Sequence, residues 1–277
     1  MPPLAVIAAL SSAAIHASWN AALKGGTDRI VDTFLIAIGG LATGIVLALW
    51  FDAPEPAAYP YLVISVTVHL LYWVCLFKGY EAGDLSHIYT ISRGSAPLLV
   101  SLGAAFFAHE IPPPIKAAGV ALVSLGVFCV GFSPRAPWRA TRWALAIGLC
   151  IATYSLFDAL GARATGSALV YVGWTTGLMS VFMIAFALWR RGPARMVAQA
   201  MVSPWRGIAI GVISFLGYGL VLWAQTFAPI AQVTALRETS VVFGALIAFF
   251  FLREHLGARR WLGASVVAAG AMLIAFG

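Results

Sequence analysis

The chain has 277 residues, of which 61% are hydrophobic and only 10% are charged. Soluble domains carry roughly a quarter charged residues, so this composition excludes a soluble globular protein and indicates an integral membrane protein. The net charge of +7 does not indicate nucleic-acid binding, because the basic residues lie between apolar runs, where they orient membrane helices.

Ten apolar runs are long enough to cross a bilayer as helices, for which about 20 residues suffice. Short separators rich in glycine, proline and charge divide them. We therefore expect an all-α integral membrane protein with ten transmembrane helices. The runs cover residues 3–23, 31–51, 60–80, 85–107, 114–132, 141–161, 167–189, 206–226, 230–252 and 258–276.

The first run carries a polar ladder. Ser12, His16, Asn20 and Lys24 follow one another at steps of four, with Trp19 beside them, so they share one side of a helix. His16 can titrate and is a candidate for proton coupling, while Trp19 and Asn20 are candidates for substrate contact. The alternative is that these groups form hydrogen bonds between helices.

The run at 60–80 ends in aromatic residues. His69, Tyr72 and Trp73 lie about one turn apart, and Tyr72 is a candidate for the wall of a substrate cavity. Aromatic residues at this depth also serve as packing groups or interface belts, and the sequence leaves both interpretations open.

The run at 85–107 contains an arginine about eight residues from its start. A charged arginine in the hydrocarbon core costs at least ~2.5 kcal/mol, so Arg93 calls for a reason. Thr90 lies on the same stripe and is a candidate substrate contact. Pro97 is expected to loosen this helix beside Arg93, as in transporters with broken helices at a midplane site.

The second half of the chain repeats the first at an offset of 144 residues. Five helices per repeat is an odd number, so the second repeat must cross the membrane upside down relative to the first. We expect residues 1–132 and 133–277 to form two inverted five-helix repeats. The matched pairs are Thr90 with Thr234, Arg93 with Arg237, Glu110 with Glu254, Gly119 with Gly263 and Gly126 with Gly270.

The matched arginines suggest a binding site for an anion. Two guanidiniums converging from the two repeats would form a fork for a carboxylate, phosphonate or phosphate group, with Thr234 beside Arg237. Each arginine could instead bind backbone carbonyls or neutralise a nearby acid. Asp158 and Glu238 are further candidates for proton coupling, and Glu238 is equally suited to neutralising an arginine.

The loops between the runs differ in charge. The odd-numbered loops hold 13 lysines and arginines and the even-numbered loops hold two, Lys116 and Arg163. Because lysine and arginine favour the cytoplasmic side, this bias predicts cytoplasmic odd loops and both termini outside.

The chain resembles a ten-helix member of the drug/metabolite transporter superfamily, the EamA-like group. The resemblance rests on HASWNAALK in the first run, on the paired segments ending at Glu110 and Glu254, and on the glycine-spaced helices that follow them. HASWNAALK together with GDLSHIYTISRGSAPLL also resembles a branch associated with phosphonate utilisation.

The resemblance implies a central cavity lined by the runs at 3–23, 60–80, 85–107, 141–161, 206–226 and 230–252. The runs at 114–132 and 258–276 would then be peripheral. Ten-helix relatives are usually drawn with cytoplasmic termini, opposite to the charge count.

We therefore expect a secondary transporter in a bacterial inner membrane that exports a small anionic or zwitterionic metabolite by alternating access. Broad-specificity efflux of lipophilic compounds and a non-transporting accessory or sensor protein are the alternatives. No enzymatic activity, cofactor or metal site is expected, because phosphate-binding loops, His-Glu-x-x-His motifs and nucleophile elbows are missing from the sequence. The expected partners are the substrate and the lipid bilayer, and a monomer and a homodimer both remain open.

Overall fold

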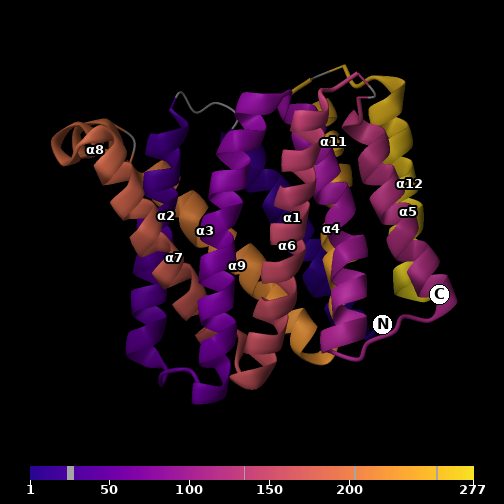
Figure 1. Cartoon of the computed structure of the whole chain (residues 1–277), viewed down its shortest axis with the longest axis horizontal. Helices are drawn as coiled ribbons and strands as arrows, with labels where there is room; N and C mark the ends of the chain where they lie inside the picture. Colours follow the sequence, from indigo (N-terminus) through magenta and orange to yellow (C-terminus); the bar gives the residue numbers. More distant parts are fainter. Residues whose placement is uncertain (24–27, 134, 203, 254) are drawn as a thin grey trace.

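The computed structural model describes residues 1–23, 28–133, 135–202, 204–253 and 255–277. This part of the chain folds into a bundle of α-helices without β-strands (Figure 1). The helices are α1 (Pro3–Leu23), α2 (Arg29–Trp50), α3 (Tyr59–Ala82), α4 (Leu85–Phe107), α5 (Pro114–Gly131), α6 (Trp138–Ala164), α7 (Ala168–Arg191), α8 (Pro193–Ala200), α9 (Pro204–Phe227), α10 (Ile230–Arg237), α11 (Ser240–Phe250) and α12 (Ala258–Phe276), with a 3-10 turn at Pro56–Ala58.

Nine segments of the described chain are long and apolar enough to span a membrane. The helix α4 is not among them, although its 23 residues are sufficient in length. Arg93 and several serines lower its hydropathy. In Figure 1 α4 runs the height of the bundle, and both chain ends lie in its lower half. An even number of crossings is needed for this arrangement, so α4 is the tenth span and the predicted all-α ten-helix membrane fold is confirmed.

The ninth span is broken near its middle into α10 and α11. Around the break the backbone turns more tightly: Glu238 N–H donates to Ala235 O (3.0 Å) and Thr239 N–H donates to Leu236 O (3.1 Å). These are bonds to the third residue back, the 3-10 pattern that often marks a functional interruption of a helix.

The matching span of the first repeat is not interrupted. The sequence predicted the loosened helix at Pro97, yet α4 continues through that residue as one helix. The break therefore lies in the repeat without the proline. Proline removes one backbone donor, which is not sufficient here to end the helix.

The packing of the helices repeats in the two halves. Helix α3 packs against α6 as α9 packs against α1, and α4 packs against α6 as α10 and α11 pack against α1. Helix α2 packs on its counterpart α7, and α5 packs on its counterpart α12. This is the contact pattern of two five-helix units related by a two-fold axis.

Glycines show that these units are inverted. A Cβ placed on Gly119 would lie 2.9 Å from Gly270 O, and one on Gly126 would lie 2.8 Å from Gly263 O. The reverse substitutions would meet the partner carbonyls at 2.7 Å in both cases. As the residue number rises along α5 it falls along α12, so these equivalent helices are antiparallel. Small residues allow such close backbone approach in membranes.

The two ends of the bundle differ. The odd-numbered connections and α8 lie at the upper end of Figure 1, and the even-numbered connections lie at the lower end. At the upper end Arg191 forms an ion pair with Asp28 (2.9 Å), whose side chain also caps the start of α2. Arg191, like Arg190 before it and Arg195 in α8, thus lies at this end of the bundle.

Candidate functional site

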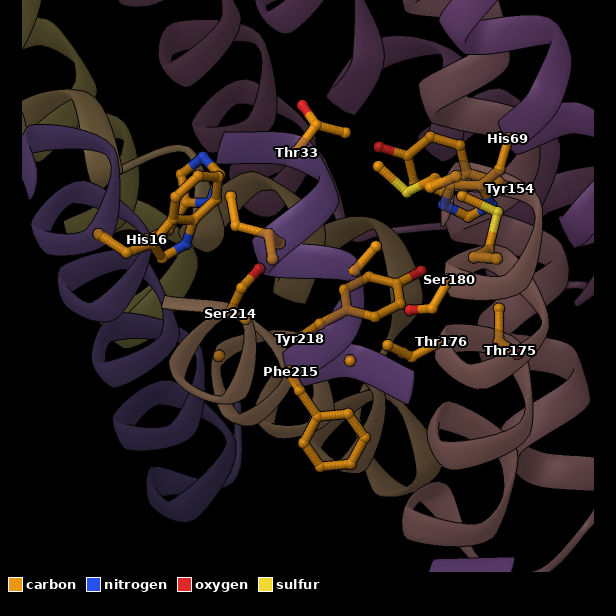
Figure 2. A pocket seen from close by; sticks show the side chains of 18 of the residues that line it. His16, Thr33, His69, Tyr154, Thr175, Thr176, Ser180, Ser214, Phe215 and Tyr218 are labelled. Atoms are coloured by element: carbon orange, nitrogen blue, oxygen red, sulfur yellow. The ribbon is translucent and has the colours of Figure 1, made fainter. Parts of the chain in front are cut away.

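A cavity of about 330 Å³ lies between the two repeats (Figure 2). This is within the range of small-molecule sites, roughly 300–1,000 Å³. It is lined by hydroxyl, aromatic and methionine side chains together with one arginine. The described lining residues are Ser12, His16, Trp19, Thr33, Ile36, Ala37, Gly40, His69, Trp73, Tyr154, Thr175, Thr176, Met179, Ser180, Met183, Gly211, Ser214, Phe215, Gly217, Tyr218 and Arg237.

These residues come from α1, α2, α3, α6, α7, α9 and α10. The resemblance implied a lining from α4 and none from the two peripheral helices. Helices α5 and α12 indeed contribute nothing to the described lining, but neither does α4. Helices α2 and α7, which the resemblance left out, form one wall.

Arg93 is held by Glu238. Its Nε lies 3.0 Å from Glu238 Oε2, and the side chains are 8% and 1% exposed. The pair joins α4 of the first repeat to the α10–α11 break of the second. The adjacent Arg237 and Glu238 are therefore not each other's ion-pair partners. Arg93 takes the role that the sequence left open as its alternative, the neutralisation of a buried acid.

The repeat explains why only one arginine is neutralised. At the offset of 144, Arg93 matches Arg237, but Glu238 matches Gly94. The second repeat thus supplies an acid that the first repeat lacks, and this acid pairs across the repeat boundary. Arg237 is left without an acid of its own.

Arg237 faces the cavity. It is the only lysine, arginine, aspartate or glutamate in the described lining. Its Cζ lies 5.6 Å from the ring centroid of Tyr218, a cation–π geometry, and its buried Nε has no hydrogen-bond partner among the described residues. The two arginines therefore do not form one fork. Of the two, Arg237 is the arginine that lines the cavity and can meet a ligand there.

Asp158 lies behind the lining and is fully buried. Its carboxylate accepts hydrogen bonds from Tyr171 Oη (3.0 Å) on α7 and from Tyr218 Oη on α9. Because Tyr218 also lies beneath Arg237, one tyrosine connects the cavity cation to the buried acid. Such a chain suits either proton transfer or a structural link between helices.

Two histidines belong to the lining. The ring of His16 meets Trp19 edge-on at 5.1 Å, and the ring of His69 stacks on Tyr154 at 3.9 Å. His69 Nδ1 also lies 3.0 Å from Ser65 O. Both arginines are within electrostatic range of His16. His16 and Trp19 both line the cavity, and their roles in proton coupling and substrate contact stay predictions.

The other candidates lie outside the described lining. Asn20 is exposed, and its amide donates to His16 O (2.7 Å) within the same helix. Tyr72 packs edge-on to Tyr154 at 6.1 Å. Lys24, the last member of the polar ladder, is outside the described residues.

The two matched threonines serve helix packing. Thr90 is buried beside Gly131 of α5. Thr234 Oγ1 donates to Ile230 O (2.9 Å) and accepts from Gln225 Nε2 (3.0 Å). Their hydroxyls lie outside the described lining, whereas Arg237, which the same match between repeats singled out, lies in it.

Hydroxyl residues of α2, α7 and α9 were missed by the sequence analysis. Thr33, Thr176, Ser180 and Ser214 all line the cavity. Thr176 and Ser180 are four residues apart, so they share a helix face, and this spacing could have identified them.

A polar cluster closes the lower end of the bundle. Arg163 binds Glu110 at 2.7 Å and also donates to Gln225 O (2.7 Å) and Ala228 O (3.0 Å). The other oxygen of Glu110 accepts from Ile230 N–H (2.7 Å). Glu110 thus pairs with an arginine in the last turn of α6. Its match Glu254 is outside the described residues.

Within the described residues, no group of three histidine, cysteine, aspartate or glutamate side chains could hold a metal ion. Cys75, Cys129 and Cys150 are free thiols.

Comparison with solved structures supports the fold. The chain matches a crystal structure with a TM-score of 0.76 over 98% of both chains at 17% sequence identity. Such a likeness at low identity concerns the fold alone.

Comparison with sequences identifies the family. The model of the EamA-like transporter family matches residues 138–276. A curated relative from Pseudomonas fluorescens, described as a probable 4-amino-4-deoxy-L-arabinose-phosphoundecaprenol flippase subunit, ArnE, is 33% identical over 88 residues, which are 31% of this chain and 74% of that protein. A family model that covers half of the chain, together with ten helices around a cavity, establishes that this chain belongs to the EamA-like transporter family, within the drug/metabolite transporter superfamily.

Proposed function

We propose that this membrane transporter carries a small anionic or zwitterionic metabolite by alternating access, with Arg237 as the residue that binds the acidic group. The observation that carries the proposal is the unpaired Arg237 guanidinium in the cavity lining. A buried arginine without an acid is costly in a membrane protein. A substrate anion would supply the missing charge.

The direction that we propose is export. The lining residues of α2 lie in the half of that helix nearest the first connection, and His16 and Trp19 lie in the corresponding half of α1, whereas those of α7 lie around its middle. Arg163 and Glu110 hold the opposite end together. With the odd loops in the cytoplasm, as their positive charge favours, the cavity lies toward the cytoplasm, where an exporter loads.

Proton coupling is the second part of the proposal. Asp158 is a buried acid connected through Tyr218 to the substrate arginine. A proton exchanged at Asp158 would change the charge behind the cavity during the transport cycle. If this is correct, Asp158→Asn will transport its substrate without responding to a pH gradient.

A broad-specificity efflux protein for lipophilic compounds is the other candidate. The aromatic and methionine part of the lining, which includes Trp19, Trp73, Phe215, Met179 and Met183, favours it. In that case Arg237 would contribute nothing to substrate binding. The ArnE relative is described as a flippase subunit. If this chain also works only as part of a larger assembly, the purified chain will transport nothing in the flux test.

The test is flux into proteoliposomes with the wild type and Arg237→Gln. The panel holds amino acids, carboxylates, phosphonates and lipophilic cations, each with and without a pH gradient. We expect anionic substrates to move in the wild type and to fail with Arg237→Gln. Arg259→Gln is the matched control, because Arg259 is exposed and donates to Phe132 O at the bundle end. Transport of lipophilic cations alone, unchanged in Arg237→Gln, would refute the proposal.

The orientation is tested separately. Single cysteines placed in α8 and near the N-terminus should react with a membrane-impermeant thiol reagent from opposite sides in intact cells. Labelling of the N-terminus from outside is expected. Labelling of α8 from outside would reverse the direction argued above.

A further inference from the structure

The cavity carries a cluster of hydroxyl groups that the proposed function does not use. Thr33 on α2, Thr176 and Ser180 on α7 and Ser214 on α9 all line it. Figure 2 shows Thr176 and Ser180 projecting from α7 toward the cavity, with Ser214 on α9 at the opposite side. We call these four residues the hydroxyl cluster. They come from both repeats, whereas the guanidinium comes from one.

These hydroxyls have no hydrogen bond to another described residue. Their neighbours in the same lining do: Thr175 Oγ1 donates to Tyr171 O (2.9 Å) and Ser12 Oγ donates to Gly217 O (2.6 Å). Serine and threonine in helices commonly satisfy themselves on the preceding turn in this way. The hydroxyl groups of the cluster are therefore available for hydrogen bonds with a molecule in the cavity.

Ser180 makes the strongest case. Its side chain is only 3% exposed, it lines the cavity, and its hydroxyl has no protein partner among the described residues. Unlike Ser124 Oγ and Ser240 Oγ, which are buried without a partner, Ser180 Oγ is open to the cavity, where a polar group of a ligand can form a hydrogen bond with it.

Gly40 of α2 packs against Ser180 in the wall of the cavity. A Cβ placed on Gly40 of α2 would lie 2.6 Å from Ser180 Oγ and 3.0 Å from Thr176 Cγ2. Any residue larger than glycine would push both side chains away. The absence of a side chain at position 40 thus leaves room for the Ser180 hydroxyl and the Thr176 methyl group.

We propose that the substrate is a polyhydroxylated anion, a sugar acid or a sugar phosphate, whose hydroxyls bind the hydroxyl cluster while its acidic group binds Arg237. This inference rests on the proposed function, because it assigns the rest of the molecule that Arg237 holds. A hydroxyl both donates and accepts, so serine and threonine match substrate hydroxyls in either direction. A lipophilic body would leave all four unbonded.

The experiment compares pairs of substrates that differ only in hydroxyl groups. Proteoliposomes containing the full chain are assayed for uptake of labelled gluconate and glucose 6-phosphate. Hexanoate, hexyl phosphate and sorbitol are the unlabelled competitors that lack the hydroxyls or the acid. Unlabelled gluconate should inhibit the uptake of labelled gluconate more strongly than hexanoate does, and unlabelled glucose 6-phosphate should inhibit the uptake of labelled glucose 6-phosphate more strongly than hexyl phosphate does. Comparing the two pairs distinguishes a carboxylate from a phosphate.

Variants locate the effect in the hydroxyl cluster. Ser180→Ala and Thr176→Val remove one hydroxyl each and should weaken the hydroxylated substrate about tenfold, leaving the hydroxyl-free competitor nearly unchanged. Thr153→Val is the matched control, because Thr153 lies outside the described lining and its hydroxyl donates to Leu149 O on the same helix. Ser214→Ala, on another helix, replaces Ser180→Ala if that variant does not fold.

The outcomes separate this inference from the proposed function. If hexanoate competes as well as gluconate, and the variants affect both alike, the hydroxyl cluster is not a substrate site, although Arg237 still binds an anion. If neither anion is transported and Arg237→Gln changes nothing, the proposed function itself fails. A preference for gluconate that Ser180→Ala abolishes supports both.

Discussion

Replacing Arg93 by glutamine should weaken substrate binding in the cavity, although Arg93 itself does not line the cavity. Arg93 lies outside the described lining, and its Nε is 3.0 Å from Glu238 Oε2. Once Arg93 is gone, Glu238 keeps one neighbouring cation, Arg237, with which it already interacts electrostatically. The carboxylate would then neutralise the guanidinium that we assign to the substrate.

The magnitude follows from the burial of the pair, at 8% and 1% exposure. Removing one partner of a buried ion pair costs about 3–5 kcal/mol, since the other charge is left uncompensated. Glu238→Gln should show this loss in full, because it leaves Arg93 unpaired in the membrane interior. Arg93→Gln should lose less, because Glu238 can turn to Arg237. Its apparent substrate affinity should nevertheless fall at least about tenfold.

The double variant Arg93→Gln/Glu238→Gln tests whether Glu238 neutralises Arg237 once Arg93 is removed. It removes both charges, so it should be more stable than Glu238→Gln alone and should recover substrate binding, because Arg237 is free again. Thermal unfolding of the purified protein and flux into proteoliposomes measure the two effects. Additive losses of stability in the double variant, or normal transport by Arg93→Gln, would refute this account.

Three further predictions concern other parts of the bundle. Gly126→Leu should destabilise the protein by about 1–3 kcal/mol, because it overpacks α5 against α12. The control Gly244→Leu should not, because a Cβ at position 244 meets no atom within 4 Å. Equal melting temperatures of the two variants would contradict the glycine contact. Arg163→Met should lower the free energy of unfolding by about 1 kcal/mol or more. Adding Glu110→Gln should lower it little further, because the bond between the two side chains is already lost. A full additional loss in thermal unfolding would contradict their pairing. Asp158→Asn should retain exchange of substrate across the membrane but lose its dependence on an imposed pH gradient; retained dependence would remove Asp158 from proton coupling.

The fold could be predicted from the sequence because apolar length and repetition are local properties of the chain. Ten runs and the offset of 144 residues sufficed for the helices and their inversion. The inverted contact of Gly119 with Gly270 then follows from the symmetry. The interruption of the ninth span was missed, because the proline at position 97 led us to expect the loosened helix in the fourth span instead.

The site could be predicted only in part, because it depends on which helices meet. Arg237 and Glu238 are neighbours in sequence, yet Glu238 binds Arg93 from the other repeat. The matched Thr90 and Thr234 both lie outside the described lining, and their role as substrate contacts stays a prediction. The match at an offset of 144 residues singled out Arg237, but it did not single out Glu238, which matches Gly94, or the hydroxyl residues of α7.

The contact between α5 and α12 is one that a five-helix unit could make with an inverted copy of itself. The aligned 88 residues are 74% of the ArnE relative, so that protein is less than half as long as the 277 residues of this chain. In an assembly of two identical units, any acid that neutralises one arginine has a twin that neutralises the other, and no cation stays free. Joining two units in one polypeptide lets each half mutate separately. The difference between Arg93, which forms an ion pair with Glu238, and Arg237, which forms none among the described residues, is therefore an asymmetry that two identical units cannot have.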